Sequence, residues 1–349
     1  MWSLHLLPPP PSGEPDEEIT FFILYVDDGL ILSNQNAVLL KMIEFLGKEF
    51  EIRSLPADRF IGVNIERDRT HRTIHLSQPD YVKTILARFG MTNCSSITVP
   101  ADPCVKLSPS MCPRTEEEKA PMINVPYLEG VGSLMHLANL TRPDISFAVG
   151  QVSRFSQNPG MEHWKGLKRI LAYLRKTVNH GLLFGGGSNE LCGYVDADYA
   201  GDLENRRSTS GAVFILNNGP ISWHSRRQTC VALSTTESEF IAASDGTKEA
   251  IWLRRLYAEL GGADLSVPLH CDNQGAIALI LNPIFHQRTK HMDVRFFFVR
   301  DAQQEGKIDV IYIETELQLA DIFTKALPTP RFEMLRHNLG VQELNIQNA

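Results

Sequence analysis

The chain has 349 residues, of which 43% are apolar; this is enough for two or three domains with folded cores and excludes a chain that is disordered throughout. Its six cysteines form no CxxC pair, so neither a zinc site nor a disulfide framework is indicated. No apolar run approaches 18 residues, and the opening MWSLHLLPPPPSG lacks the basic and long apolar segments of a signal peptide. We therefore expect an intracellular protein, cytoplasmic or nuclear, that is not secreted and makes no membrane contact.

The net charge of −7 argues mildly against a nucleic-acid-binding protein, because such proteins usually carry a surplus of basic residues. The basic residues are nevertheless gathered locally. Residues 163–180 contain several lysines and arginines and no acid, and further positive charge follows at Arg206/Arg207, at Arg226/Arg227 and in residues 288–300. Each patch is either a solvated surface or a contact for phosphate, and the sequence leaves both interpretations open.

The start of the chain changes character at Thr20. Residues 1–18 are proline-rich and then acidic, which predicts an unstructured lead-in. The segment TFFILYVDDGLILSN then places an acid pair between two apolar runs, which predicts a hairpin with Asp27, Asp28 and Gly29 at the turn. Such a turn is common in hairpins, so the pattern by itself leaves a structural and a functional role open.

The middle of the chain alternates apolar segments with turn-forming ones. Apolar spacing predicts a helix at 38–50, a hairpin at 60–66 and 73–76, and a short helix at 81–89. Residues 101–126 are rich in proline, serine and charge, and this composition predicts a linker. We then expect helices at 128–140, 143–156 and 163–176, before a Gly-Gly-Gly-Ser hinge at 185–188.

The C-terminal part alternates strands and helices. Three strands are expected at 191–195, 211–216 and 221–224, followed by a long helix from Ser234 to the Gly261-Gly262 pair. The expected elements after it are a strand at 267–271, helices at 274–281 and 293–304, and a strand at 307–313. This order predicts a mixed sheet covered by helices.

Four acids stand where these elements begin or end: Asp196, Glu239, Asp272 and Asp321. Carboxylates from distant parts of a chain repel one another when they cluster, unless a hard divalent cation neutralises them. Two Mg²⁺ ions, with Mn²⁺ as the alternative metal, are the usual apparatus for displacing a phosphodiester oxygen. The pattern therefore predicts a phosphodiesterase.

Neighbouring acids and structural roles compete with this prediction. Glu237 completes a capping box with Ser234 and is expected to fold back onto the helix, which leaves Glu239 for metal. Asp198 is the less certain neighbour of Asp196. Asp272 could equally cap the next helix, and Asp321 could equally favour a helix dipole.

Several motifs together resemble the pol polyprotein of copia-type LTR retrotransposons, over roughly residues 20–335. YVDD between apolar strands looks like the catalytic hairpin of a reverse transcriptase palm. The other motifs are LSQPDYVKTILARFGM, YLEGVGSLMHLANLTRPDISFAVGQVSRF, HWKGLKRILAYLRKT, GYVDADYAGD, LSTTESEF, CDNQGAI, RTKHMDVRFFFVR and LADIFTKALP.

The resemblance implies an α/β (α+β) fold, with a truncated reverse transcriptase palm and helical connection followed by a ribonuclease H-like mixed-sheet domain. We expect a disordered lead-in at 1–18, partial palm and thumb at 19–100, and linker and connection at 101–188. The ribonuclease H-like domain is expected at 189–330 and a C-terminal tail at 331–349.

The resemblance also implies that Asp196, Glu239, Asp272 and Asp321 are catalytic metal ligands that act on the RNA strand of an RNA–DNA hybrid. Asp27 and Asp28 are the corresponding polymerase remnant. Hybrids are recognised through 2′-hydroxyls and phosphates, and the expected contacts are Arg206, Arg207, Lys290, His291, Lys165, Lys168 and Arg169.

The polymerase pattern is incomplete, because a third palm aspartate upstream of YVDD is missing from the sequence. We therefore expect no polymerisation by this chain alone. Two alternatives stay open: a non-catalytic relic or domesticated nucleic-acid-binding protein, and a chain that polymerises only with a partner supplying the missing palm and fingers. The sequence also leaves the oligomeric state open.

Overall fold

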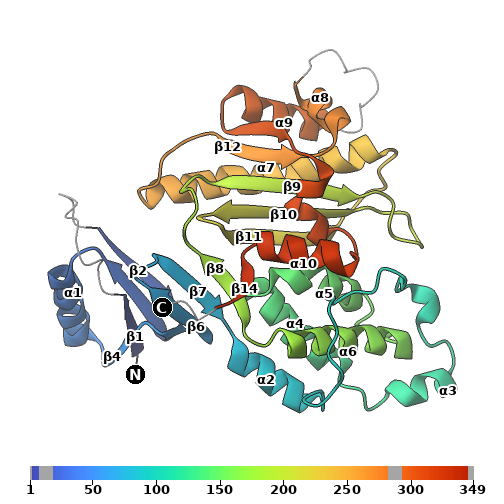
Figure 1. Cartoon of the computed structure of the whole chain (residues 1–349), viewed down its shortest axis with the longest axis horizontal. Coiled ribbons are helices and arrows are strands. Elements are labelled where there is room, and N and C mark those ends of the chain that lie inside the picture. Colours follow the sequence, from blue (N-terminus) through green and yellow to red (C-terminus); the bar gives the residue numbers. More distant parts are fainter. Residues whose placement is uncertain (1, 8–18, 282–292, 345–349) are drawn as a thin grey trace.

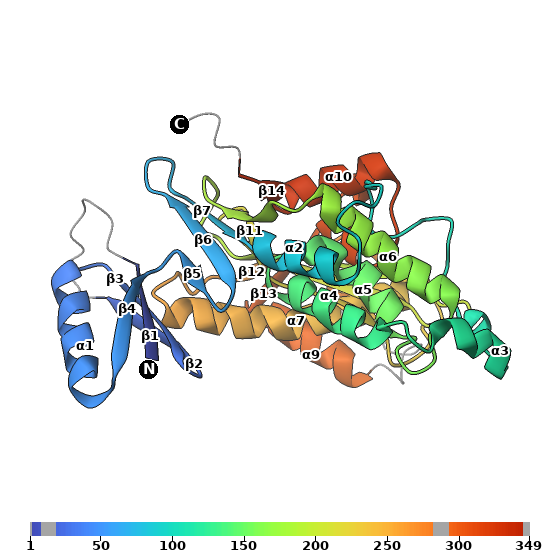
Figure 2. The ribbon, with the colours of Figure 1, turned by 90° about the horizontal axis from the view of Figure 1, so that it is seen from below.

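The computed structural model describes residues 2–7, 19–281 and 293–344 (Figure 1). These residues form three sheets, which we number along the chain. The first sheet has the order β2-β3-β1-β4, the second β14-β8-β7-β6-β5, and the third β11-β10-β9-β12-β13. Figures 1 and 2 show the first sheet and helix α1 at one end of the molecule, away from the third sheet.

The first sheet contains the predicted hairpin. Strands β2 (Thr20–Tyr25) and β3 (Asp28–Ser33) pair antiparallel with Tyr25 opposite Asp28, so the turn is Val26-Asp27. Helix α1 (Asn36–Glu49) and strand β4 (Ile52–Pro56) follow. A small core holds this unit together, formed by Ile31, Leu39, Met42, Ile43, Leu46 and Ile52.

The predicted unstructured lead-in is wrong for its first residues. Trp2–Leu7 form strand β1, which pairs in parallel with β3 on one side and β4 on the other. The proline run begins only at Pro8, so nothing in the preceding segment prevents a strand. Pairing there satisfies backbone groups of β3 and β4 that would otherwise be left unpaired. Residues 8–18 lie outside the described part of the chain.

The second sheet joins the middle of the chain to its C-terminus. It contains β5 (Arg59–Phe60), β6 (Val63–Asp68), β7 (Thr73–Ser77), β8 (His180–Phe184) and β14 (Val341–Glu343). The predicted C-terminal tail at 331–349 is therefore wrong. Residues up to Glu343 form α10 (Thr329–Asn338) and β14, because apolar side chains at Phe332, Leu335, Leu339 and Val341 are buried in the core.

The connecting region is helical. Its helices are α2 (Pro79–Arg88), α3 (Glu116–Lys119), α4 (Tyr127–Leu140), α5 (Ser146–Ser153) and α6 (Met161–Lys176). Their core continues without a break into the third sheet and the C-terminus through Val213, Phe323 and Leu335. A hydrogen bond from Trp223 Nε1 to the Ala138 carbonyl, 2.8 Å long, fastens the sheet to α4.

The third sheet is the predicted mixed sheet, and the fold-class prediction is confirmed. Strands β9 (Cys192–Asp198), β10 (Thr209–Leu216) and β11 (Gly219–Arg227) are antiparallel neighbours, and β12 (Val267–Cys271) and β13 (Ile308–Tyr312) run parallel to β9. Its helices are α7 (Thr235–Glu259), α8 (Gln274–Leu281) and α9 (Asp293–Gln304).

The third sheet has a tight turn between two of its strands and a long helix across one face. Asn217 and Asn218 form the turn between β10 and β11, and both have positive φ, 53° and 64°, as a two-residue hairpin turn of the right twist requires. Helix α7 covers one face, where Phe240 packs over Val195, Phe214 and Leu269 in a fully buried core. Among the described helices, none is long and apolar enough to cross a membrane.

Candidate metal centre

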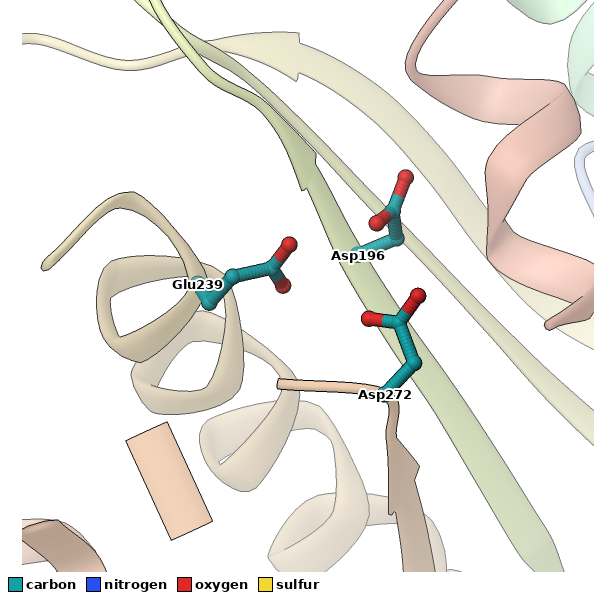
Figure 3. A group of neighbouring side chains, drawn as sticks. All are labelled: Asp196, Glu239 and Asp272. Carbon is teal, nitrogen blue, oxygen red and sulfur yellow. The ribbon is translucent and has the colours of Figure 1, made fainter. Parts of the chain in front are cut away.

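Three carboxylates converge at one end of the third sheet: Asp196, Glu239 and Asp272. Each offers an oxygen, and these oxygens all lie within 4.8 Å of one another. Asp196 is on β9, Glu239 is in the first turns of α7, and Asp272 follows β12 directly. Figure 3 shows the three side chains pointing toward one another. We call these three residues the carboxylate cluster.

The sheet dictates where two of these acids lie. Strand β9 is central, with β10 on one side and the parallel strand β12 on the other. Because the carboxyl ends of parallel neighbours meet at the same edge, Asp196 near the end of β9 and Asp272 after β12 are brought together. Residue Gly211 pairs with Asp196, and a side chain there would collide with Thr324 and Phe323.

The start of α7 selects Glu239 as the third acid. Ser234 caps the helix by accepting a hydrogen bond from the Glu237 backbone, at 3.1 Å. The Glu237 carboxylate folds back and accepts a hydrogen bond from the Leu233 backbone, at 2.7 Å. Glu237 is thus used by the helix end, as predicted from the capping box. Glu239 remains for the cluster.

Burial and charge make the cluster electrostatically costly without a cation. Burial raises the pKa of the Asp196 carboxyl, opposed by Lys325 and reinforced by Asp321. Burial and the charges of Asp196 and Asp272 raise the pKa of the Glu239 carboxyl well above its usual range. Three like charges this close would not all remain ionised alone.

The donor set fits a hard divalent metal ion. All three side chains offer carboxylate oxygens, the donors that Mg²⁺ and Mn²⁺ prefer. Glu239 is 7% exposed, and its Oε2 atom is buried without a hydrogen-bond partner in the described part of the chain. A buried oxygen of this kind is costly unless something binds it, and a cation within the cluster would satisfy it.

The segment after β13 holds the cluster in place. Thr324 Oγ1 donates to Asp196 Oδ2 at 2.5 Å, and Thr315 Oγ1 donates to Asp272 Oδ2 at 2.7 Å. Gln318 Nε2 donates to the Val195 carbonyl at 3.0 Å, next to Asp196 in the chain. These bonds fix the orientation of two cluster carboxylates, as supporting residues around metal ligands commonly do.

The fourth predicted ligand, Asp321, lies beside the cluster and is paired with cations. Asp321 is 3% exposed. Its Oδ1 atom is 2.7 Å from Lys325 Nζ and its Oδ2 atom is 3.2 Å from Arg331 Nη2. Lys325 also lies 3.8 Å from Asp196 Oδ2. The structure therefore brings three of the four predicted acids together, with Lys325 linking the fourth to them.

Asp198, the second acid of β9, lies outside the cluster. It is on β9 two residues after Asp196, and burial raises the pKa of its carboxyl. It lines a separate cavity, together with Lys325.

The predicted nucleic-acid contacts lie at several places. Arg206 is exposed and Arg207 is half-buried, both between β9 and β10. On α6, Lys165 pairs with Glu162 at 2.6 Å, Arg169 pairs with Asp102 at 2.9 Å, and Lys168 lies over the Trp164 ring. Lys290 and His291 lie outside the described residues.

The predicted polymerase acids are far from the cluster in the fold. Asp27 lies in the turn and Asp28 starts β3, both in the first sheet at one end of the molecule (Figure 1). Within the described ranges, these two acids have no third Asp, Glu, His or Cys close enough to complete a metal site.

Sequence reasoning missed the supporting residues Thr315, Gln318, Thr324, Lys325 and Arg331. Thr324 and Lys325 were within the LADIFTKALP motif, three and four residues after Asp321. That spacing places side chains on the same side of a helical turn. It could therefore have identified Thr324 and Lys325 as neighbours of Asp321. Arg331 lay in the predicted tail, so no local pattern pointed to it.

The topology of the third sheet, with α7 across one face and three acids at its end, defines a ribonuclease H-like fold. The family model described as reverse transcriptase (RNA-dependent DNA polymerase) matches residues 13–103. The retrovirus-related Pol polyprotein from transposon TNT 1-94 of Nicotiana tabacum is 45% identical over 93% of this chain and 25% of its own length. The chain is homologous to the Pol polyproteins of copia-type retrotransposons.

Solved structures are similar at lower identity. LC11-RNase H1 in complex with an RNA/DNA hybrid is 14% identical, covers 39% of this chain and 94% of its own, and has a TM-score of 0.31. The foamy viral protease-reverse transcriptase in complex with an RNA/DNA hybrid is 16% identical, covers 88% of this chain and 37% of its own, and has a TM-score of 0.43. The chain spans about a quarter of the length of the Pol polyproteins that it matches.

Proposed function

We propose that this chain is a metal-dependent ribonuclease H that hydrolyses the RNA strand of RNA–DNA hybrids. The observation that carries the proposal is the carboxylate cluster, in which Glu239 keeps a buried oxygen without a partner. Homology to the copia-type Pol polyproteins supports the choice of a nucleic acid as the substrate.

Asp196, Glu239 and Asp272 would hold the metal, which we take to be Mg²⁺ or Mn²⁺. When bound, a divalent ion of this kind supplies an activated water and neutralises charge on the phosphate. A second ion would draw on Asp321, which is paired with Lys325 and Arg331 in the structure. The proposal therefore rests on the three residues of the carboxylate cluster and does not require Asp321.

The chain's own residues have three tasks in this proposal. Thr324 and Thr315 keep the carboxylates of Asp196 and Asp272 oriented. Lys325 holds a positive charge at the edge of the cluster, where it would attract the phosphate of the strand to be cut. Val195, Phe240 and Cys271, the chain neighbours of the three ligands, are fully buried in the core and anchor the backbone from which the three carboxylates extend.

The test is cleavage of a labelled RNA–DNA hybrid by the purified chain in Mg²⁺, beside Asp272→Asn and the control Asp301→Asn. Asp301 is exposed on α9 in the same domain and has no part in the cluster. We expect the parent and the control to cleave and Asp272→Asn to lose at least about 100-fold in rate. Equal cleavage by all three, or none by a folded parent, would contradict the proposal; the second result favours a non-catalytic relic.

We propose that the β2–β3 hairpin, which carries Asp27 and Asp28, serves nucleotidyl transfer only together with a partner that supplies the missing palm and fingers. Asp27 and Asp28 lack a third nearby acid among the described residues, although a metal-dependent nucleotidyl transfer needs its ions held firmly. The strand before them also exposes Phe22 and Leu24, which lie on one face of the strand, as expected of a face that packs on another segment. We expect no primer extension by the chain alone, and extension under those conditions would refute this.

A further inference from the structure

Lys325 places a positive charge between the carboxylate cluster and Asp321. Its Nζ atom lies 2.7 Å from Asp321 Oδ1 and 3.8 Å from Asp196 Oδ2. Both acids are buried, whereas the Lys325 side chain is 38% exposed. An ammonium group between two carboxylates keeps its proton, because the carboxylates stabilise its charged form. The site therefore contains a cation that belongs to the chain itself.

Both oxygens of Asp321 are in contact with cations of the chain. Oδ1 faces Lys325, and Oδ2 lies 3.2 Å from Arg331 Nη2. The Arg331 guanidinium also donates hydrogen bonds to the backbone carbonyls of Thr315 and Glu316, which fix its position. Among the described residues, the acids close enough to share one metal ion form the carboxylate cluster, which does not include Asp321. The charge of Asp321 is thus neutralised by side chains.

The backbone around Lys325 holds the ammonium group at this place. The Lys325 N–H donates to the Asp321 carbonyl at 3.4 Å, so the two side chains lie one helical turn apart on the same side. The preceding residues Phe323 and Thr324 are buried, and Thr324 Oγ1 donates to Asp196 Oδ2 at 2.5 Å. The segment that carries Lys325 is therefore bonded to both of the acids that its ammonium group approaches.

The charges of the site balance with one divalent ion. The four predicted ligands carry four negative charges when they are ionised, and Lys325 and Arg331 supply two positive charges beside them. One ion of charge +2 in the carboxylate cluster completes the neutralisation. A second ion would leave a surplus of positive charge in a largely buried site and would lie close to the ammonium group, where like charges repel.

We propose that Lys325 takes the place of a second divalent ion, so that the site binds a single Mg²⁺ or Mn²⁺ ion, at the carboxylate cluster. This inference deepens the proposed function and rests on it, since it takes a metal ion to bind at the cluster. The sequence predicts two ions for the four acids, whereas this arrangement has one ion and one ammonium group. In hydrolysis the ammonium group supplies fixed positive charge where a two-ion site would use its second metal.

The test counts bound ions and does not use activity. Mn²⁺ is titrated into the purified full chain, and the free ion is measured from its electron paramagnetic resonance signal. The variants are Lys325→Met, which keeps the length of the side chain without its charge, and Lys325→Arg, which keeps the charge. The control is Lys248→Met, which removes a lysine paired with Asp245 on α7, nine residues or about 14 Å along the helix beyond Glu239.

We expect the parent, Lys325→Arg and Lys248→Met to bind one Mn²⁺ ion per chain and Lys325→Met to bind two. The second ion should bind Lys325→Met at least about 10-fold more tightly than it binds the parent, because the repulsion by the ammonium group is removed. Two ions of similar affinity on the parent, or a single ion on folded Lys325→Met, would overturn the inference. An absence of binding to the parent would overturn it as well.

Thermal unfolding gives an independent measurement and reports whether each variant is folded. In EDTA, Lys325→Met should unfold at a lower temperature than the parent, because Asp196 and Asp321 lose the cation between them. Saturating Mn²⁺ should raise the unfolding temperature of Lys325→Met by more than that of the parent, because two bound ions stabilise the folded chain more than one. An equal rise in both proteins would contradict the inference. If Lys325→Met does not fold, the number of ions bound to the parent still decides.

The inference and the proposed function fail separately. If the parent binds two ions and cleaves the hybrid, Lys325 does not replace an ion and the proposed function stands. If the parent binds one ion and Lys325→Met binds two, but the parent does not cleave, the inference stands and the proposed function is wrong.

Discussion

Glu239 offers a prediction about stability that depends on the electrostatics of the cluster. The substitution Glu239→Gln keeps the shape of the side chain and removes its charge. Burial and the charges of Asp196 and Asp272 raise the pKa of Glu239 from the usual value of 4.5. The folded chain therefore holds a proton at Glu239 in a pH range where the unfolded chain has already released it.

The sign of the effect follows from this difference. Below pH 4.5 both states hold the proton and Glu239 costs nothing. As the pH rises above 4.5, the free energy of unfolding falls by about 1.4 kcal/mol for each pH unit, until the folded-state pKa is reached. Over the three pH units from 4.5 to 7.5 this slope amounts to about 4 kcal/mol. We expect Glu239→Gln to stabilise the metal-free chain by up to about 4 kcal/mol at pH 7.5 and not at pH 4.

The assay is urea denaturation in EDTA at both pH values, followed by circular dichroism. The matched control is Glu237→Gln, two residues earlier on the same helix. Glu237 accepts a hydrogen bond at the helix start, so its loss of charge should destabilise the chain by about 0.3–1 kcal/mol. Equal stability of Glu239→Gln and the parent at pH 7.5, or a gain that persists at pH 4, would refute the reasoning.

Two other substitutions test the supports of the site and of the fold. Thr324→Val removes the hydrogen bond to Asp196 and should lower the rate of hybrid cleavage by about 10–100-fold with little change in stability; an unchanged rate would contradict the orienting role. Asp144→Asn breaks the fully buried pair with Arg142 and should cost about 3–5 kcal/mol in urea denaturation, whereas exposed Asp58→Asn should cost nothing measurable.

The carboxylate cluster was predictable because local rules place each acid. Asp196 and Asp272 follow apolar strands, and strand ends meet at one edge of a sheet. Glu239 follows from the capping box, which assigns Glu237 to the helix end. Each step needs only neighbouring residues, so sequence alone identified the three acids that the structure brings together.

The partners of Asp321 could not be predicted in the same way. Arg331 reaches Asp321 only because α10 packs into the core through Phe332 and Leu335, whereas the sequence predicts a tail in this segment. Strand β1 was missed for a related reason. Its pairing with β3 and β4 is a contact between segments separated in sequence, and no local periodicity reports such a pairing.

The central claim is that Asp196, Glu239 and Asp272 together bind a divalent metal ion, and calorimetric titration of Mg²⁺ or Mn²⁺ into the purified chain tests it most directly. We predict binding to the parent and to Asp301→Asn, and loss of binding in Asp272→Asn. Undiminished binding to folded Asp272→Asn, or no binding to the parent, would contradict the claim.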